Sequence, residues 1–214
     1  LLPQDNYFSR SFAMLHHAVA HTVEGRMSEA LELYQQAIQI AQLSEQWFVQ
    51  LMARYQLAKT YERYGRLNDA EIELMRSLTI FSRLKGKYTN LECYLYKELA
   101  AIHIARNELE DAWEDFQNYL DASPVVKSSP DDISAHIYLA QFHHANHDPG
   151  GTKFELHIAK QLSELTESIQ DDLEVDLATM EIELQRNITE TAERWFKRHS
   201  EEYLEKLPPN QRVN

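Results

Sequence analysis

The stretch AVAHTVEGRMSEALELYQQA at residues 18–37 decides the fold class of this chain. Ala18, Ala30, Tyr34 and Ala37 have the spacing that places small and large apolar residues on the inner sides of two helices. Gly25 lies between them, and glycine readily adopts the left-handed conformation that closes one helix before the next. The stretch therefore predicts a helix, a tight turn and a second helix.

The same pattern returns along the chain with a step of 40 to 42 residues. Its small residues are Ala30, Ala70, Ala112, Thr152 and Ala192, and the residues twelve positions before them are Ala18, Ala58, Ala100, Ala140 and Met180. Large residues follow at Tyr34, Leu74, Phe116, Leu156 and Phe196, and the turn positions are Gly25, Gly65, Asn107, His147 and Asn187. Only 5 Gly and 6 Pro occur in 214 residues, which favours long helices over strands.

Two antiparallel helices cannot bury their apolar faces alone, so each pair must be covered by the next pair. We therefore expect an all-α solenoid of about five helix-turn-helix repeats, forming a single domain over residues 1–214. The repeats are expected at about residues 8–43, 44–86, 89–123, 129–168 and 171–206. The chain begins at Leu1 rather than Met, and we expect it to be a fragment of a longer protein.

The pattern resembles that of the tetratricopeptide repeat (TPR) family. Ala18, Gly25, Ala30, Tyr34 and Ala37 occupy the family's signature positions, and so do Leu57, Ala58, Tyr61, Gly65, Ala70 and Leu74 in the second repeat. The long step is similar to that of the TPR arrays of bacterial signalling and transcription regulators, including MalT-like activators and quorum-peptide sensors. The resemblance covers about residues 10–206 and implies a right-handed superhelix.

In the TPR family the first helix of each pair lines a concave groove, so the resemblance implies that outward positions of these helices contact a partner. These positions are Met52, Tyr55, Lys59, Arg63, Tyr94, Lys97, Glu98, Ile137, Tyr138, Gln141 and His144. Tyr and Arg are frequent anchors in recognition of peptides and proteins. The alternative is an ordinary solvated helix face whose long side chains lie along apolar surface.

The first expected helix differs from the others, because residues 11–23 contain no Lys, Arg, Asp or Glu and are apolar on all sides. Such a helix is normally covered on two faces. Two explanations stay open. Further repeats precede Leu1 in the longer protein, or the helix docks on a second copy or a partner through Phe12, Leu15 and Val19.

The net charge of −13 is carried by the second half of the chain. Residues 1–107 hold 12 Lys or Arg against 11 Asp or Glu, and residues 108–214 hold 9 against 23. This balance disfavours binding to nucleic acids and to anionic membranes, which need clustered cations. The acids Glu164, Glu167, Asp171, Asp172, Glu174 and Asp176 either steer a basic partner segment or form a solvated face.

Ten histidines raise the question of a metal site, notably His17 with His21 and His143 with His147, which have helical i, i+4 spacing. His21, His103 and His143 share the repeat position of Tyr61, which favours a packing role for them. His136, His143 and His147 fall on one helical face, where adventitious metal capture stays open. We expect no metal, no cofactor and no catalytic residue.

The sequence holds no GxSxG motif and no phosphate-binding glycine loop, and the single cysteine, Cys93, has no catalytic signature around it. We therefore expect no enzymatic activity, and the lone cysteine fits a cytoplasmic location.

The leading hypothesis is a protein- or peptide-binding TPR module that serves as the sensor or regulatory domain of a larger signalling or transcription regulator. The alternatives are a small-ligand sensor and an assembly scaffold that self-associates.

Overall fold

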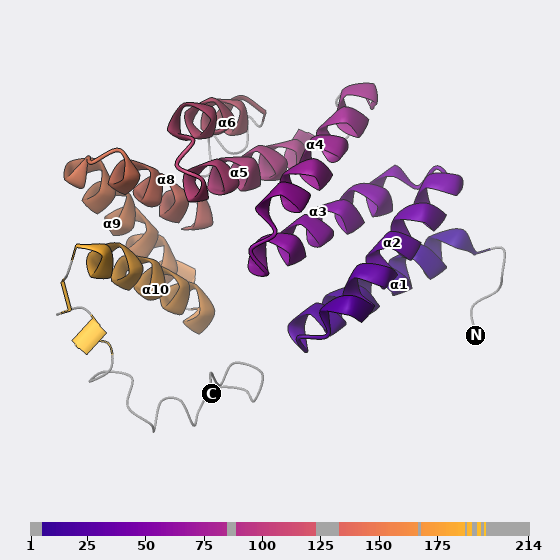
Figure 1. Cartoon of the computed structure of the whole chain (residues 1–214), viewed down its shortest axis with the longest axis horizontal. Coiled ribbons are helices and arrows are strands. Elements are labelled where there is room, and N and C mark those ends of the chain that lie inside the picture. The colour runs from indigo at the N-terminus through magenta and orange to yellow at the C-terminus, as the bar shows by residue number, and fades with distance from the viewer. Residues whose placement is uncertain are drawn as a thin grey trace. The chain divides into compact units, whose positions relative to one another are not determined.

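The computed structural model describes residues 6–84, 89–122, 133–166, 168–186, 188–189, 192–193 and 195. These residues form nine helices and no strand, which confirms the all-α prediction (Figure 1). None of these helices combines the length and the apolar character that crossing a membrane requires. Backbone contacts divide the chain into two compact units, residues Leu1–Ser128 and Ser129–Asn214. The right-handed superhelix stays a prediction.

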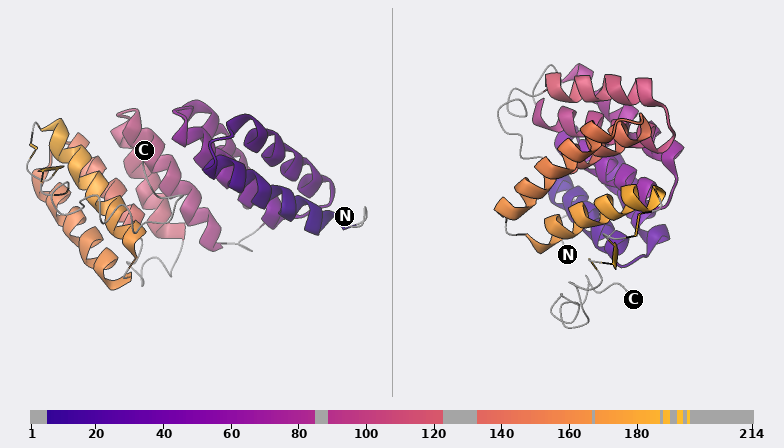
Figure 2. Two further views of the ribbon diagram at one scale, coloured as in Figure 1. Left: turned by 90° about the horizontal axis from the view of Figure 1, so that it is seen from below. Right: turned by 90° about the vertical axis from the view of Figure 1, so that its left-hand side faces the viewer.

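The first unit contains three helix pairs. They are α1 (Tyr7–Val23) with α2 (Met27–Leu43), α3 (Trp47–Arg63) with α4 (Leu67–Arg83), and α5 (Thr89–Ala105) with α6 (Leu109–Ala122). Each helix packs against the next one in the sequence, and α1 also contacts α3. Figure 2 shows the helices of this unit, coloured from indigo to magenta, stacked side by side. The first helices of the first two pairs therefore lie next to each other, as in a TPR array.

The second unit contains α8 (Ile133–Ala145), α9 (Pro149–Thr166) and α10 (Ile169–Gln185). Helices α8 and α9 form one antiparallel pair, and α10 contacts both of them. The second helix expected for the fifth repeat extends to about residue 206 and falls mostly outside the described residues. Asn187 and Phe196, which the repeat pattern assigns to that pair, also lie outside them.

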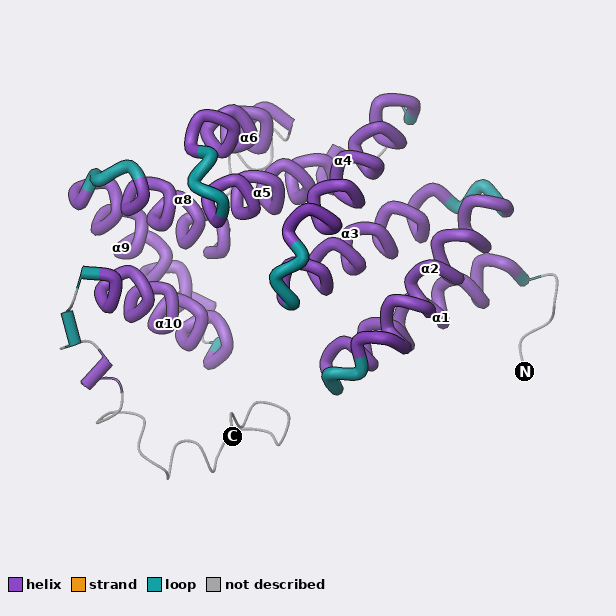
Figure 3. The backbone as a smooth tube through the Cα atoms, viewed as in Figure 1, coloured by secondary structure: helices purple, strands orange, loops and turns teal. Residues whose placement is uncertain are grey.

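A residue in the left-handed conformation closes the first helix of each described pair, at the teal turns of Figure 3. These residues are Gly25 (φ 75°), Gly65 (φ 71°), Asn107 (φ 61°) and His147 (φ 57°), which confirms four predicted turn positions. The amide of Arg26, one residue after Gly25, donates a hydrogen bond to the carbonyl of His21 at 2.9 Å. This bond closes the helix end in the usual glycine-capped arrangement.

The N-terminal end of α9 differs in sequence from those of the second helices in the other pairs, because it reads Asp148-Pro149-Gly150-Gly151. The amides of Gly150 and Gly151 both donate hydrogen bonds to Asp148 Oδ1 at 3.0 Å, so Asp148 caps the helix. These amide bonds, that of Gly151 above all, and the neighbouring His143 ring hold the pKa of Asp148 below its usual value. A Cβ atom at Gly151 would clash with the His143 ring and the Asp148 carboxylate, so a larger residue would require these side chains to move.

The small and large residues of the repeat pattern form the core of the first unit. Ala18, Ala30, Ala58, Ala70, Ala100 and Ala112 are all buried. Tyr34, Leu74 and Phe116 are also buried, and each stabilises the unit by about 1.5–3 kcal/mol. In the second unit Ile137, Ala159, Val175 and Ala178 form the core, whereas Leu156, at the repeat position of Tyr34, is only half-buried.

Candidate functional site

The predicted groove residues of α3 follow one another by about one helical turn along one face of that helix. Met52 and Tyr55 are half-buried and pack against the core of the first unit, while Lys59 is partly exposed and Arg63 is exposed. The face thus presents a thioether and a phenol ring near its middle and a cation at its C-terminal end.

A polar network joins this face of α3 to α5. The hydroxyl of Tyr55 donates a hydrogen bond to Glu98 Oε1 at 3.0 Å, and Lys59 Nζ lies 2.7 Å from Glu98 Oε2. Lys59 also pairs with Glu62 at 3.1 Å. Burial raises the pKa of Glu62, and the charge of Glu98 adds to that increase, while Lys59 opposes it. Three predicted groove residues are therefore brought together by direct bonds.

Two predicted contact residues of α5 are not exposed. Glu98 is buried because it points toward α3, where Tyr55 and Lys59 reach its carboxylate. Lys97 is also buried, and its ammonium lies 5.1 Å from the centre of the Tyr94 ring. The prediction that Lys97 and Glu98 face outward is therefore wrong. Tyr94 itself is 43% exposed and stays available for contact.

The predicted contact residues of the second unit lie on α8. Ile137 is buried in the core against Ala159 and Val175, so the prediction that it faces a partner is wrong. Tyr138 packs partly against that core. Gln141 and His144 are half-buried, and His144 Nε2 lies 3.0 Å from Gln185 Oε1 on α10. On this helix only part of the predicted set reaches the surface.

Helix α1 presents an aromatic stripe to solvent. Phe8 and Phe12 stack with their ring centres 5.7 Å apart, and the His16 ring meets Phe12 edge-on at 4.4 Å. Phe12 is 37% exposed, and its role in docking stays a prediction. Leu15 is only 4% exposed and belongs to the core, so its assignment to that face is wrong. Val19 is half-buried and packs against the core.

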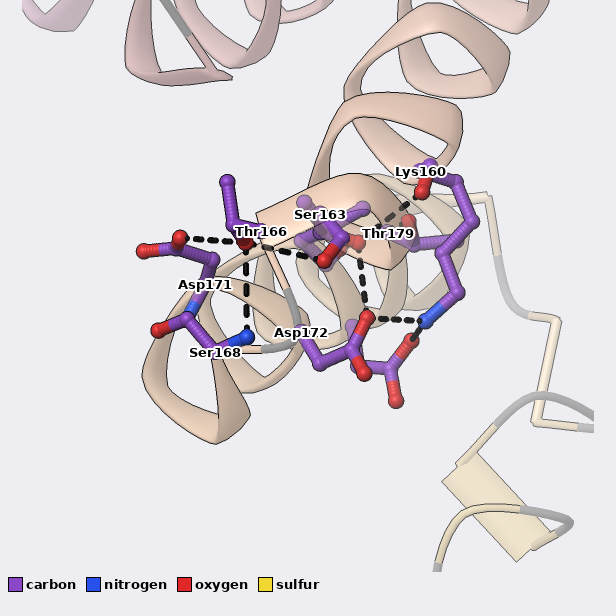
Figure 4. Close-up of polar contacts among 9 residues, drawn as sticks. Lys160, Ser163, Thr166, Ser168, Asp171, Asp172 and Thr179 are labelled. Carbon is purple, nitrogen blue, oxygen red and sulfur yellow. Dashed lines mark hydrogen bonds and ion pairs between the residues drawn. The ribbon is translucent and has the colours of Figure 1, made fainter.

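The acidic stretch of the second unit is tied into the junction between α9 and α10, as the dashed lines in Figure 4 show. Lys160 Nζ lies 3.0 Å from Asp172 and 3.4 Å from Asp176. Ser163 donates a hydrogen bond to Asp172 at 2.7 Å, and Thr166 donates one to Asp171 at 2.8 Å. Several of these carboxylates therefore hold two helices together, and Glu167 lies outside the described residues.

Lys160 is partly buried in this junction, and burial alone lowers the pKa of a lysine. The hydrogen bond to Asp172 and the charges of Asp176 and Asp172 outweigh that effect and raise the pKa of Lys160. Lys160 therefore stays charged and neutralises part of the acidic stretch.

The histidines at the Tyr61 position contact their own turns and helix pairs. His103 Nδ1 lies 2.7 Å from Asp115 on α6, His143 Nδ1 lies 3.0 Å from Asp148, and His21 is buried. The rings of His17 and His21 lie 4.7 Å apart. Among the described residues, no group of three or more His, Cys, Asp and Glu side chains is arranged to hold a metal ion.

One recurring polar pair was not predicted from the sequence. Arg54 on α3 pairs with Glu73 on α4, and His136 on α8 lies 2.7 Å from Glu155 on α9. Both pairs join the same two repeat positions, four residues before Ala58 or Ala140 and one residue before Leu74 or Leu156. A basic side chain and a carboxylate at two positions of a known repeat register were the signal that could have revealed them.

The family model of the MalT-like TPR region matches residues 1–212. Comparison with curated proteins returns no match. The family match spans every described helix and agrees with the helix pairs, the left-handed turns and the register of buried small residues found in the structure. The chain therefore belongs to the family of MalT-like TPR regions.

Proposed function

We propose that this TPR region binds a protein or peptide across α3 and α5 and serves as the sensor or regulatory domain of a larger signalling or transcription regulator. The observation that carries the proposal is the network of Tyr55, Lys59 and Glu98, which joins two neighbouring groove helices. Exposed Arg63 and Tyr94 flank this network on the same two helices.

The network favours binding because it fixes the surface in advance. Side chains that are already held by hydrogen bonds lose little conformational freedom when a partner arrives, so less of the contact energy is spent on ordering them. Met52 and Tyr94 then offer apolar contact area, and Arg63 offers a cation. Aromatic and arginine side chains of this kind are frequent anchors in protein interfaces.

A partner that contacts both helices would couple the second and third repeats. Each repeat of a solenoid contacts only its neighbours, so a small change in the angle between two repeats alters the curvature of the array. Membership of the MalT-like family supports such a regulatory role. In this proposal partner occupancy becomes a change of shape that an attached effector domain can detect.

The test begins with a peptide library displayed on phage and selected against the chain. Affinities of the selected peptides are then measured by fluorescence anisotropy. The combined variant Met52→Ala, Arg63→Ala and Tyr94→Ala should weaken binding at least tenfold while the helical circular dichroism signal is kept. The matched control is Ile72→Ala with Met75→Ala, which trims side chains of α4 that are 47% and 51% exposed. Peptides that bind the groove variant and the wild type equally would show that α3 and α5 do not form the binding surface.

A further inference from the structure

A hollow of about 600 Å³ lies between α9 and α10 in the second unit. Leu156 and Lys153 line it from α9, Ile182 and Glu183 line it from α10, and Trp195 also borders it. Pockets that hold small molecules have volumes of roughly 300–1,000 Å³. The hollow is therefore large enough for a small organic ligand.

The repeat register explains why this space is open. In the first unit the equivalent hollow between α2, α3 and α4 measures only about 230 Å³. Two tyrosines occupy the corresponding positions there, Tyr34 four residues after Ala30 and Tyr61 three residues after Ala58. In the second unit these positions hold Leu156 and Glu183. Replacing two buried phenol rings by shorter side chains leaves space, so the hollow is a property of the sequence.

Glu183 brings a carboxylate into the hollow. Its Oε2 atom is buried and receives no hydrogen bond from the described residues. A buried charged acceptor that lacks a donor is costly, and such groups in native structures are normally satisfied by a partner, water or a ligand. A ligand with an ammonium group would satisfy this oxygen with a charge-assisted hydrogen bond.

The same hollow also has a cationic side. Lys160 is held by Asp172 and Asp176, but Lys153 and Arg186 are exposed and line the hollow from α9 and from the residue after α10. A ligand carboxylate beside these two side chains would be stabilised by their charge. The hollow thus offers Glu183 as an acceptor for a cation and Lys153 and Arg186 as donors for an anion.

Apolar surface completes the lining. Leu156, Ile182 and Trp195 all border the hollow, and together they can cover an aliphatic or aromatic group. Such a lining, mostly apolar with a few convergent polar groups, is typical of small-molecule sites.

We propose that this hollow binds a small zwitterion of the apolar amino-acid class. The ligand ammonium donates to Glu183, the carboxylate faces Lys153 and Arg186, and the apolar side chain packs on Leu156 and Trp195. The site is distinct from the proposed groove. On α10 the repeat equivalents of Tyr55 and Lys59 are Leu177 and Glu181, and neither lines the hollow.

Isothermal titration calorimetry of the full chain with L-leucine and L-phenylalanine tests the proposal. At least one of them should bind saturably with a stoichiometry of one. 3-Methylbutylamine lacks the carboxylate of leucine and 4-methylpentanoate lacks its ammonium, so each should bind at least tenfold more weakly than leucine. Glu183→Gln should also weaken amino-acid binding at least tenfold, because it removes the negative charge with little change of shape.

Two further variants test whether amino-acid binding depends on the hollow rather than on other parts of the second unit. Leu156→Tyr combined with Glu183→Tyr places the tyrosines of the first unit in the second, and it should abolish binding and raise the melting temperature. Leu177→Ala, on the groove side of α10, should leave amino-acid affinity unchanged. The proposal is overturned if neither amino acid binds, if the Glu183→Gln variant binds amino acids as well as the wild type does, or if 3-methylbutylamine binds as tightly as leucine. A higher melting temperature in the tyrosine variant without amino-acid binding by the wild type would identify a packing defect instead.

Discussion

Lys59 on α3 and Glu98 on α5 are 39 residues apart in the sequence, yet the Lys59 ammonium lies 2.7 Å from the Glu98 carboxylate. The side chain of Glu98 is 4% exposed and that of Lys59 is 35% exposed. The pair thus joins a solvent-facing cation to a buried anion across two repeats.

Lys59→Met removes the cation and leaves the Glu98 carboxylate buried. The hydrogen bond from the Tyr55 hydroxyl to Glu98 is kept. We expect the free energy of unfolding in urea to fall by about 1–3 kcal/mol, the cost of an uncompensated buried charge at a partly hydrated site. Adding Glu98→Gln should restore part of the loss. Arg66→Met is the control, since it breaks an exposed pair with Asp69 and should cost at most about 1 kcal/mol. Equal losses in the two single variants would contradict the prediction.

The His103 and Asp115 pair makes stability depend on pH. Burial raises the pKa of Asp115 to about 6, and contact with His103 limits the increase. The folded state therefore holds this proton more tightly than the unfolded state, so the contribution of Asp115 to stability is present below about pH 4 and is lost as the pH rises through about 6.

The variant Asp115→Asn lacks this titration. Between pH 4 and pH 7 we expect the wild type to lose about 1–3 kcal/mol of unfolding free energy relative to the variant. Urea denaturation of both proteins across this range measures the difference. Curves that stay parallel would rule out a raised Asp115 pKa.

Replacing Gly65 and Gly150 by alanine should change the free energy of unfolding in opposite directions. Gly65 has a φ of 71°, and a Cβ atom added there would meet no other atom within 4 Å, so the cost of Gly65→Ala is that of the left-handed backbone, about 1–2 kcal/mol. Gly150 lies in the first turn of α9 without a positive φ, and Gly150→Ala should stabilise by about 0.4–1 kcal/mol. Thermal and urea unfolding check both values. A stabilising Gly65→Ala would show that the turn adopts another conformation.

Leu15 and Phe12 distinguish packing from docking on α1. Leu15→Ala should destabilise the chain by about 2–5 kcal/mol, as is usual for a buried leucine. Phe12→Ala trims a ring that is partly exposed and should cost less. If α1 docks on a second copy, sedimentation velocity should show concentration-dependent association of the wild type, and Phe12→Ala should reduce it. Association that persists in this variant would place the contact elsewhere.

The repeat register predicted the turns and the core because both depend on spacing along one chain. Helices of fixed pitch place Ala18 opposite Ala30, and Gly25 must fall between them. Four of the five turn positions have the expected left-handed backbone, and the fifth lies outside the described residues.

The groove was harder to predict because exposure depends on what the neighbouring helix carries. Glu98 has the polarity of a surface residue, but Tyr55 and Lys59 of another repeat satisfy it in the interior. The outward position transferred to Ile137 is buried for a similar reason, because Ala159 and Val175 cover it. The hollow beside Glu183 results from residues that differ between the repeats. A search for residues that the repeats share does not detect it.

The Arg54–Glu73 and His136–Glu155 pairs occupy the same repeat positions, so one helix pair can replace another in an engineered array. A segment cut before the first helix and after the second helix of one pair carries both members of its polar pair, so the pair survives transplantation. An array built from copies of the second repeat would thus contain one Arg–Glu tie for each copy, and its length could be chosen in whole repeats.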